Sequence, residues 1–176
     1  MRHTTLILLG TLALASVLSF VGAKPAPEGE PAPPTTYVLV RHTERADNDP
    51  RDPDLSEAGL ERADRLAHML SSIPISAVYS TDYARTRQTA APLASLAKLE
   101  IETYDPRSPA ESLASIAREH AGEGVLIVGH SNTIPDLVRR LGGEAPMPEF
   151  EHDEYDNVFI VTVLADGRVI THRLHS

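Results

Sequence analysis

Short apolar runs alternate with longer amphipathic stretches along most of the chain. The runs at 37–40, 77–80, 100–104 and 125–128 have the composition of strands that are covered on both faces of a sheet. Between them, apolar residues recur at steps of three and four, as they do on the buried face of a helix. This alternation predicts an α/β domain with a mostly parallel central sheet and helices in the layers on either side.

Capping and helix-breaking residues mark the expected helices. Ser56 can cap the first helix, whose apolar stripe would run from Leu60 to Leu70 before Ile73-Pro74 ends it. The second begins near Tyr83 and should be disturbed by Pro92, because proline lacks a backbone donor and crowds the preceding turn. Two further helices are expected at 109–120 and 133–141, the latter ending at Gly142-Gly143.

The carboxyl-terminal part of the chain predicts a β-hairpin. Two apolar runs at 157–164 and 169–174 flank Asp166-Gly167, a dipeptide that is typical of tight hairpin turns. The predicted fold is therefore a three-layer α/β/α sandwich with a mostly parallel central sheet and a C-terminal β-hairpin.

The amino-terminal residues differ from this pattern. Arg2, an apolar run from Leu6 to Val21 and the small residues Gly22 and Ala23 resemble a secretory signal peptide, which we assign to residues 1–23. An uncleaved membrane anchor is the alternative, because the run approaches the length of a marginal membrane span. Five prolines over residues 24–35 favour an extended linker, leaving 36–176 as the folded domain in an exported protein, periplasmic or secreted.

Charge and cysteine content exclude several classes of function. The formal net charge is −9, so general electrostatic attraction to nucleic acid is not expected, nor is a membrane contact beyond a possible N-terminal anchor. Cysteine is absent, which excludes disulfides, thiolate zinc sites and cysteine nucleophiles. Any anion must be bound by a local cluster of cations.

Such a cluster is expected where the strands end. Arg41 and His42 follow the first strand, Arg85 and Arg87 follow the second, and His130 follows the strand at 125–128. Ligand sites of open α/β sheets lie at the carboxyl ends of the strands. Arginine matches the geometry of phosphate oxygens, and a neutral imidazole is a competent nucleophile. The arrangement predicts phosphoryl-transfer chemistry on a phosphorylated small molecule or a phosphoprotein.

Three segments carry a resemblance to a known family. "LVRHTER", "YSTDYARTRQTA" and "LIVGHSNTIP" are similar, in order and spacing, to the signature segments of the histidine phosphatase superfamily, with its phosphoglycerate mutase-like fold. The resemblance extends from Tyr37 to about Leu174 and is that of a small branch 1-type phosphatase. It implies a phosphoric monoester hydrolase or a phosphohistidine phosphatase that needs no cofactor and no metal.

The resemblance also implies roles for individual residues. His42 would be the nucleophile that becomes phosphohistidine, and Arg41, Arg85 and His130 would bind the phosphoryl group. Thr43 replaces the usual glycine, which we expect to narrow the pocket or to add a hydroxyl donor.

Three assignments rest on position alone. Asn132 follows His130 and is a candidate phosphate ligand, or else it or Ser131 caps the last helix. Glu44 is the candidate proton donor, with Asp105, Glu111 and the acids at 151–156 as alternatives. Arg87 and Arg45 are more simply explained as rim or salt-bridge residues. A phosphoramidate or another good leaving group would make a dedicated acid less necessary.

Two other classes of function compete with an exported phosphatase. A non-catalytic module of the same fold would bind a phosphorylated ligand or partner without turnover. A metal-dependent hydrolase would use His42, His130 and the acidic 149–157 segment, although pocket arginines would repel a cation. Neither the physiological substrate nor the oligomeric state follows from the sequence.

Overall fold

The computed structural model describes residues 32–145 and 148–176, so the predicted signal peptide and most of the predicted linker lie outside the described residues. In chain order, its elements are β1 (Thr35–Arg41), α1 (Glu57–Leu70), β2 (Ala77–Ser80), α2 (Ala84–Ala97), β3 (Ile101–Thr103), α3 (Pro109–Glu119), β4 (Gly124–Gly129), α4 (Thr133–Arg140), β5 (Asn157–Val163) and β6 (Val169–His175). Strand β1 includes Thr35, the last residue of the predicted linker.

The six strands form one sheet in the order β3-β2-β4-β1-β5-β6. Strands β1 to β4 are parallel, whereas β5 pairs antiparallel with β1 and with β6. Strand β4 lies at the centre of the parallel part, with β1 on one side and β2 on the other. The carboxyl ends of β1, β2 and β4 therefore meet at one edge of the sheet.

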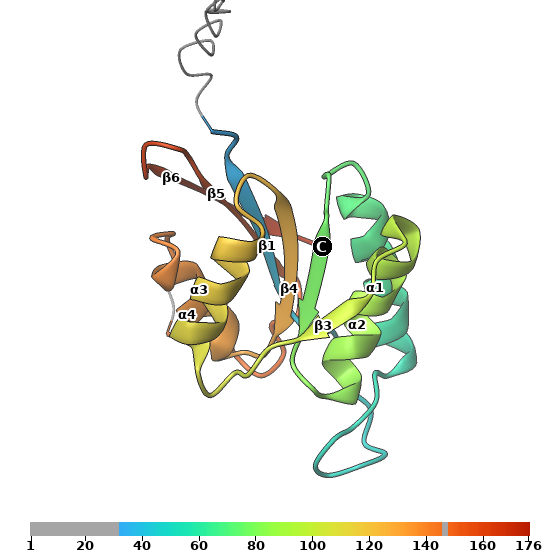
Figure 1. Cartoon of the computed structure of the whole chain (residues 1–176). Coiled ribbons are helices and arrows are strands. Elements are labelled where there is room, and N and C mark those ends of the chain that lie inside the picture. The colour runs from blue at the N-terminus through green and yellow to red at the C-terminus, as the bar shows by residue number, and fades with distance from the viewer. Residues whose placement is uncertain (1–31, 146–147) are drawn as a thin grey trace, which may run out of the picture. The chain divides into compact units, whose positions relative to one another are not determined.

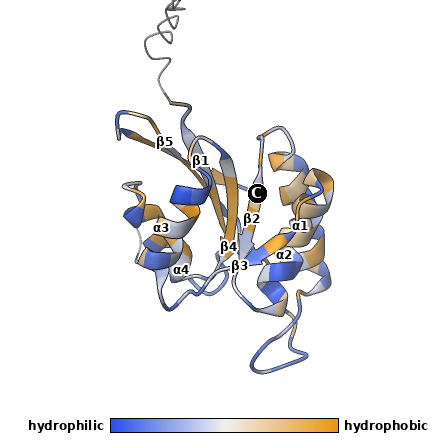
Figure 2. Ribbon diagram, viewed as in Figure 1, coloured by the Kyte–Doolittle hydropathy of each residue, from blue (hydrophilic) through white to orange (hydrophobic). Residues whose placement is uncertain are grey.

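Helices cover both faces of the sheet, as Figure 1 shows: α1 and α2 lie on one side and α3 and α4 on the other. Alternate residues of each strand feed two separate cores. Val38, Val78 and Leu126 pack with α1 and α2, while Leu39, Tyr79 and Ile127 pack with α3 and α4. The strands and inner helix faces are correspondingly the most hydrophobic parts of the ribbon in Figure 2. The predicted three-layer α/β/α fold is confirmed.

Two local expectations differ from the structure. Leu60 does not join the apolar stripe of α1, because Gly59 takes the buried position and the Leu60 side chain is 50% exposed. Gly59 is needed there, since a Cβ atom would collide with the carbonyl oxygen of Glu44. Helix α2 continues through Pro92 to Ala97, so the expected disturbance does not end the helix.

Turn and cap residues act as their chemistry suggests. The Ser56 hydroxyl accepts a hydrogen bond from the Gly59 amide and caps α1. Gly142 and Gly167 adopt the positive φ angles required after α4 and in the β5–β6 turn. Within residues 32–145 and 148–176, no helix is long and apolar enough to cross a membrane.

Candidate active site

His42 lies immediately beyond β1 and is held in a single orientation. Its backbone amide donates to Gly129 O at 2.8 Å, and its Nδ1 lies 2.8 Å from Thr43 O. A carbonyl oxygen only accepts, so Nδ1 carries the proton and Nε2 keeps its lone pair. The side chain is buried and lines a cavity at the carboxyl edge of the sheet. Its Nε2 has the electronic form of a nucleophile.

Thr43 does not use its hydroxyl in this cavity. The side chain is fully buried, and Oγ1 donates to Gly59 O at 2.8 Å in the first turn of α1. The Thr43 amide donates to Thr89 Oγ1 on α2 at 3.1 Å. The expectation of an additional donor for the substrate was therefore wrong. Threonine instead ties the peptide that follows the nucleophile to two helices.

His130, beyond β4, faces His42 at 5.5 Å between ring centroids. Its backbone amide donates to Thr133 Oγ1 at 2.8 Å, and its Nε2 lies 2.9 Å from Thr81 Oγ1. Thr81 in turn contacts the Thr86 hydroxyl at 2.9 Å. With Nε2 occupied, Nδ1 is the ring nitrogen that remains available, since it has no hydrogen-bond partner among the described residues.

Both imidazoles are neutral near pH 7. Burial, together with the nearby charges of Arg41 and Arg85, lowers the pKa of His42 to about 3, although the hydrogen bond to Thr43 O opposes the shift. Burial likewise lowers the pKa of His130 to about 4, together with Arg85 and Arg41, while Asp52 opposes the shift. A bound anion would favour the protonated forms, because it brings a negative charge among these cations.

Arg41, at the end of β1, is buried beneath the 151–155 loop. Its Nη1 donates to the carbonyls of Glu151 and Glu154, both at 2.8 Å, and Nη2 donates to His152 O at 3.2 Å. The guanidinium lies 4.1 Å from the Tyr155 ring centre. Nε is buried without a partner. Nε–H and one Nη2–H lie on the same edge of the planar guanidinium, so this edge makes at most one of the hydrogen bonds that the described residues supply.

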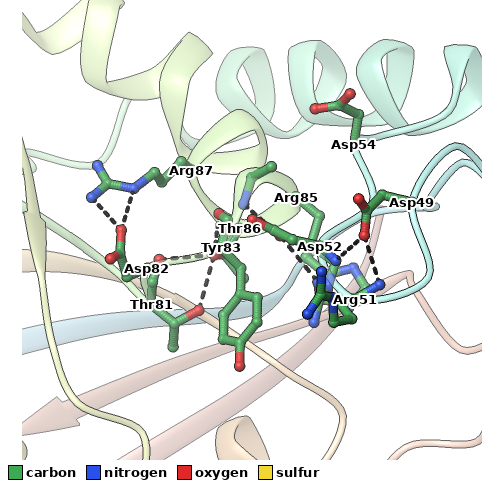
Figure 3. Close-up of polar contacts among 12 residues, drawn as sticks. Asp49, Arg51, Asp52, Asp54, Thr81, Asp82, Tyr83, Arg85, Thr86 and Arg87 are labelled. Atoms are coloured by element: carbon green, nitrogen blue, oxygen red, sulfur yellow. Dashed lines mark hydrogen bonds and ion pairs between the residues drawn. The ribbon is translucent and has the colours of Figure 1, made fainter.

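Arg85, in the first turn of α2, is held differently. Its Nη1 lies 3.5 Å from Asp52 Oδ1, and the same oxygen accepts from the Ala84 amide at 2.9 Å. Its guanidinium also lies 4.6 Å from the Tyr83 ring centre. Figure 3 shows Asp52 beside Arg85, whereas Arg87 points away toward Asp82. Arg87 pairs with Asp82 at 2.7 Å and does not line the cavity.

These groups surround one cavity of about 470 Å³ at the carboxyl edge of the sheet. Its basic lining consists of four arginines and three histidines: Arg41, Arg45, Arg85, Arg107, His42, His130 and His152. The amino end of α4 contributes Ser131, Asn132 and Thr133. No Asp or Glu of the described residues lines the cavity. In a chain of net charge −9, this is a local anion site beside a nucleophilic imidazole.

Comparison with known proteins agrees with this geometry. Residues 37–106, which contain His42 and Arg85, match the model of the histidine phosphatase superfamily (branch 1). Over these residues the chain is similar to the histidine phosphatase superfamily. Members of this superfamily are phosphatases or mutases. No curated protein sequence matches the chain.

Solved structures share the fold of this chain at low sequence identity. The protein histidine phosphatase SixA bound to tungstate is 21% identical with a TM-score of 0.64, covering 80% of this chain and 96% of that one. A protein from Agrobacterium tumefaciens that is described as a phosphohistidine phosphatase SixA is 24% identical, with a TM-score of 0.61. The match covers 80% of this chain and 98% of that one. A mutant phosphoserine phosphatase from Entamoeba histolytica, bound to phosphoserine, is 15% identical with a TM-score of 0.63, covering 81% and 97%.

Most of the predicted site residues lie together. Arg41, His42, Arg85, His130 and Asn132 all line the cavity. The Asn132 side chain makes no capping hydrogen bond to α4, and the Ser131 alternative is likewise not observed as the cap. Their roles in catalysis stay predictions.

Glu44 does not lie with them. Its carboxylate accepts from Arg62 Nε and Nη2, the latter at 2.7 Å, and it is not part of the cavity lining. Hydrogen bonds and charge from Arg62 keep its pKa low, although burial opposes the shift. An ionised carboxylate that is already paired cannot donate a proton to a leaving group, so this geometry argues against Glu44 as the proton donor. Asp105 is engaged too, by Arg107 at 3.0 Å.

Sequence reasoning missed several cavity residues. Arg45 was expected in a loop salt bridge, but it lines the cavity and has no ion pair among the described residues. Arg107 and Tyr83 follow strands β3 and β2, so their position at the carboxyl edge was a usable signal. His152 lies in the acidic segment once considered for metal binding. Across residues 32–145 and 148–176, no group of three or more His, Asp or Glu side chains could hold a metal ion.

Proposed function

We propose that this protein is an exported phosphatase that hydrolyses a phosphoramidate or phosphomonoester through a phosphohistidine on His42. The observation that carries the proposal is the orientation of His42, whose Nδ1 is occupied by Thr43 O while Nε2 remains free in a cavity lined by arginines. This is the arrangement that in-line attack on a phosphoryl group requires.

The reaction has two steps. His42 Nε2 attacks phosphorus, the bond to the leaving nitrogen or oxygen breaks, and the leaving atom departs with the electron pair and takes up a proton. Arg41, Arg85 and His130 stabilise the charge on the equatorial oxygens. Water then attacks the phosphohistidine, the phosphorus–nitrogen bond to His42 breaks, and inorganic phosphate leaves. His42 returns to its neutral form.

Phosphoramidates are the substrate class we favour. An alkoxide is a poor leaving group, and enzymes that release one usually place a carboxylic acid beside it. The described part of this cavity has no carboxyl group in its lining. A leaving amine or imidazole nitrogen is basic enough to acquire its proton without a dedicated acid. Two structural neighbours, described as a protein histidine phosphatase and a phosphohistidine phosphatase, support the same substrate class.

The test is hydrolysis of phosphoramidate, p-nitrophenyl phosphate and an alkyl phosphate by the purified protein, with and without chelator. We expect chelator-resistant turnover, inhibition by vanadate, and rates for the first two substrates at least about 100-fold above the alkyl phosphate, since a general acid contributes about that factor. His42→Asn should abolish turnover and the acid-labile phosphoenzyme. His68→Asn, at an exposed position of α1, is the matched control and should change neither.

Two outcomes would redirect the proposal. Loss of activity with chelator would favour the metal-dependent hydrolase, and anion binding without turnover or phosphoenzyme would favour the phosphate-binding module. Export is a separate part of the proposal and is supported only by the signal-like residues 1–23. Sequencing the amino terminus of the mature protein tests whether the signal-like segment is removed. A start near Lys24 supports cleavage and export, whereas an intact Met1 contradicts cleavage.

A further inference from the structure

The 151–155 loop makes a set of contacts to Arg41 that leaves its charge available. Three carbonyl oxygens, from Glu151, His152 and Glu154, accept hydrogen bonds from its Nη atoms, and the Tyr155 ring lies against its guanidinium. A carboxylate in the same place would orient the guanidinium but would also neutralise it. Carbonyl dipoles orient it while leaving its full positive charge for the phosphoryl group.

The conformation of the 151–155 loop must itself be stabilised, because its carbonyl oxygens have to stay within hydrogen-bonding distance of Nη1 and Nη2 of Arg41. Glu154 provides a contact on each side. Its Oε2 accepts from the Glu151 amide at 2.8 Å, closing the loop across the residues that bind Arg41. Its Oε1 lies 3.9 Å from Arg173 Nη2 on β6. Arg173 is itself held by Asn157 Oδ1, which accepts from its Nε at 2.7 Å.

A continuous set of contacts thus leads from the sheet to the anion site. It runs from β6 through Arg173 to Glu154, then through the loop carbonyls to Arg41, which lines the cavity. Glu154 itself is not in the cavity lining. An effect of Glu154 on anion binding through contacts therefore has to act through Arg41.

We propose that Glu154 is a positioning residue that holds the 151–155 loop closed on Arg41 and so keeps the Nε edge of the Arg41 guanidinium available to the phosphoryl group. The role rests on the proposed function, since it concerns the same anion site. It also gives the acidic segment a purpose other than metal binding: its peptide carbonyls, and one of its carboxylates, shape the anion site.

The test compares Glu154→Ala with Asp153→Ala in the full chain. Asp153 is the matched control, because it is an exposed acid of the same loop whose side chain makes no hydrogen bond or ion pair with another described residue. We expect Glu154→Ala to weaken vanadate binding and raise KM roughly tenfold, because a misplaced binding group costs on that order or more. Asp153→Ala should change both by less than about twofold.

Two further variants separate positioning from a general structural role. Glu154→Gln keeps an oxygen for the Glu151 amide and should restore most of the vanadate affinity. In an Arg41→Ala background, Glu154→Ala should have no further effect on vanadate affinity, because the residue it acts through is gone. Equal effects of Glu154→Ala with and without Arg41 would overturn the proposal, as would a fall in thermal stability with unchanged vanadate affinity.

Failure of this inference and failure of the proposed function give different results. If the wild-type protein binds no vanadate, the anion site itself is refuted. If the wild type binds vanadate and Glu154→Ala binds it equally well, only the role of Glu154 is refuted. The measurement needs no turnover, so it is informative for a catalytic and for a non-catalytic anion site.

Discussion

Two acidic loops approach the cavity, and each holds one arginine in its own way. The 46–54 loop offers a side chain, the carboxylate of Asp52, to Arg85. The 151–155 loop offers main-chain carbonyls to Arg41 and turns its acids elsewhere. Similar acidic composition therefore produces two kinds of contact: Arg85 is paired directly with a carboxylate, whereas Arg41 is hydrogen-bonded to carbonyls and feels the Glu154 carboxylate only through its charge.

Burial sharpens the contrast. Arg41 is 5% exposed, and its pKa is lowered mainly by desolvation. Burial also lowers the pKa of Arg85, but the Asp52 carboxylate opposes that shift. The charges of Tyr155 and Glu154 oppose the shift at Arg41 as well, but no carboxylate is hydrogen-bonded to its guanidinium, and a buried charge without a direct counter-ion is costly until an anion arrives. Arg41 should therefore contribute more to anion binding than Arg85, although both line the same cavity.

The largest predicted effect comes from removing each arginine separately. Arg41→Ala should lower kcat/KM by about 10³-fold and Arg85→Ala by about 10²-fold, at the two ends of the range for one lost oxyanion donor. Steady-state kinetics on p-nitrophenyl phosphate measures both. Arg87→Ala, two residues beyond Arg85 but paired with Asp82, is the control and should stay near wild type. An equal or reversed order of the two effects would contradict the comparison.

The next effect is a fall in the free energy of unfolding as the pH decreases. Arg41 and Arg85 both contribute to it, because their charges help to lower the pKa values of His42 and His130. The pKa values of His42 and His130 are lowered to about 3 and about 4 in the folded protein. In the unfolded chain each is about 6.5. Below pH 6.5 the unfolded chain thus binds protons that the folded protein does not. The free energy of unfolding should fall with decreasing pH, by up to about 1.4 kcal/mol per pH unit for each histidine.

Urea unfolding at pH 6.5 and pH 5 measures this loss. His130→Gln should lose about 2 kcal/mol less than the wild type over that interval, because one of the two depressed pKa values is removed. Other titrating groups are shared by both proteins and cancel in the difference. Vanadate should reduce the loss in the wild type by favouring protonated histidine. Identical pH dependences of wild type and variant would show that His130 is not depressed.

The smallest effect tests the Asp52 contact directly. Asp52→Asn keeps an acceptor for the Ala84 amide and removes the charge beside Arg85. Vanadate affinity should rise about threefold, as expected for a partly exposed pair worth under about 1 kcal/mol. Asp49→Asn, in the same loop and bonded only to nearby amides, should leave affinity unchanged. Weaker binding by Asp52→Asn would indicate that the carboxylate orients Arg85 more than it neutralises it.

Much of the fold and the main site residues could be predicted because their signals are local. Each parallel strand is a short apolar run, and Arg41, His42 and His130 directly follow such runs. Once the strands are parallel, their carboxyl ends must meet. The glycine and serine at helix ends were readable for the same reason. The family resemblance added the roles, which no spacing alone could supply.

The remaining features depend on contacts between distant segments. The carbonyls that hold Arg41 belong to residues 110 to 113 positions further along the chain. No hydrophobic pattern or motif indicates that main-chain atoms of an acidic loop will meet that arginine. Glu44 was chosen for its nearness to His42 in sequence, yet it turns to Arg62 on α1. Thr43 was expected to face the substrate, but a close approach of α1 offered its hydroxyl the Gly59 carbonyl.

The main-chain character of the Arg41 contacts has a consequence for how this protein can change. Every amino acid has the same carbonyl group, so residues 151–153 can vary without removing a partner of Arg41. Among them, His152 lines the cavity. Substrate preference could therefore drift, or be engineered by grafting loop sequences, while the phosphoryl-binding groups stay in place. Glu154, which follows this stretch, should not tolerate such variation, because its carboxylate closes the loop.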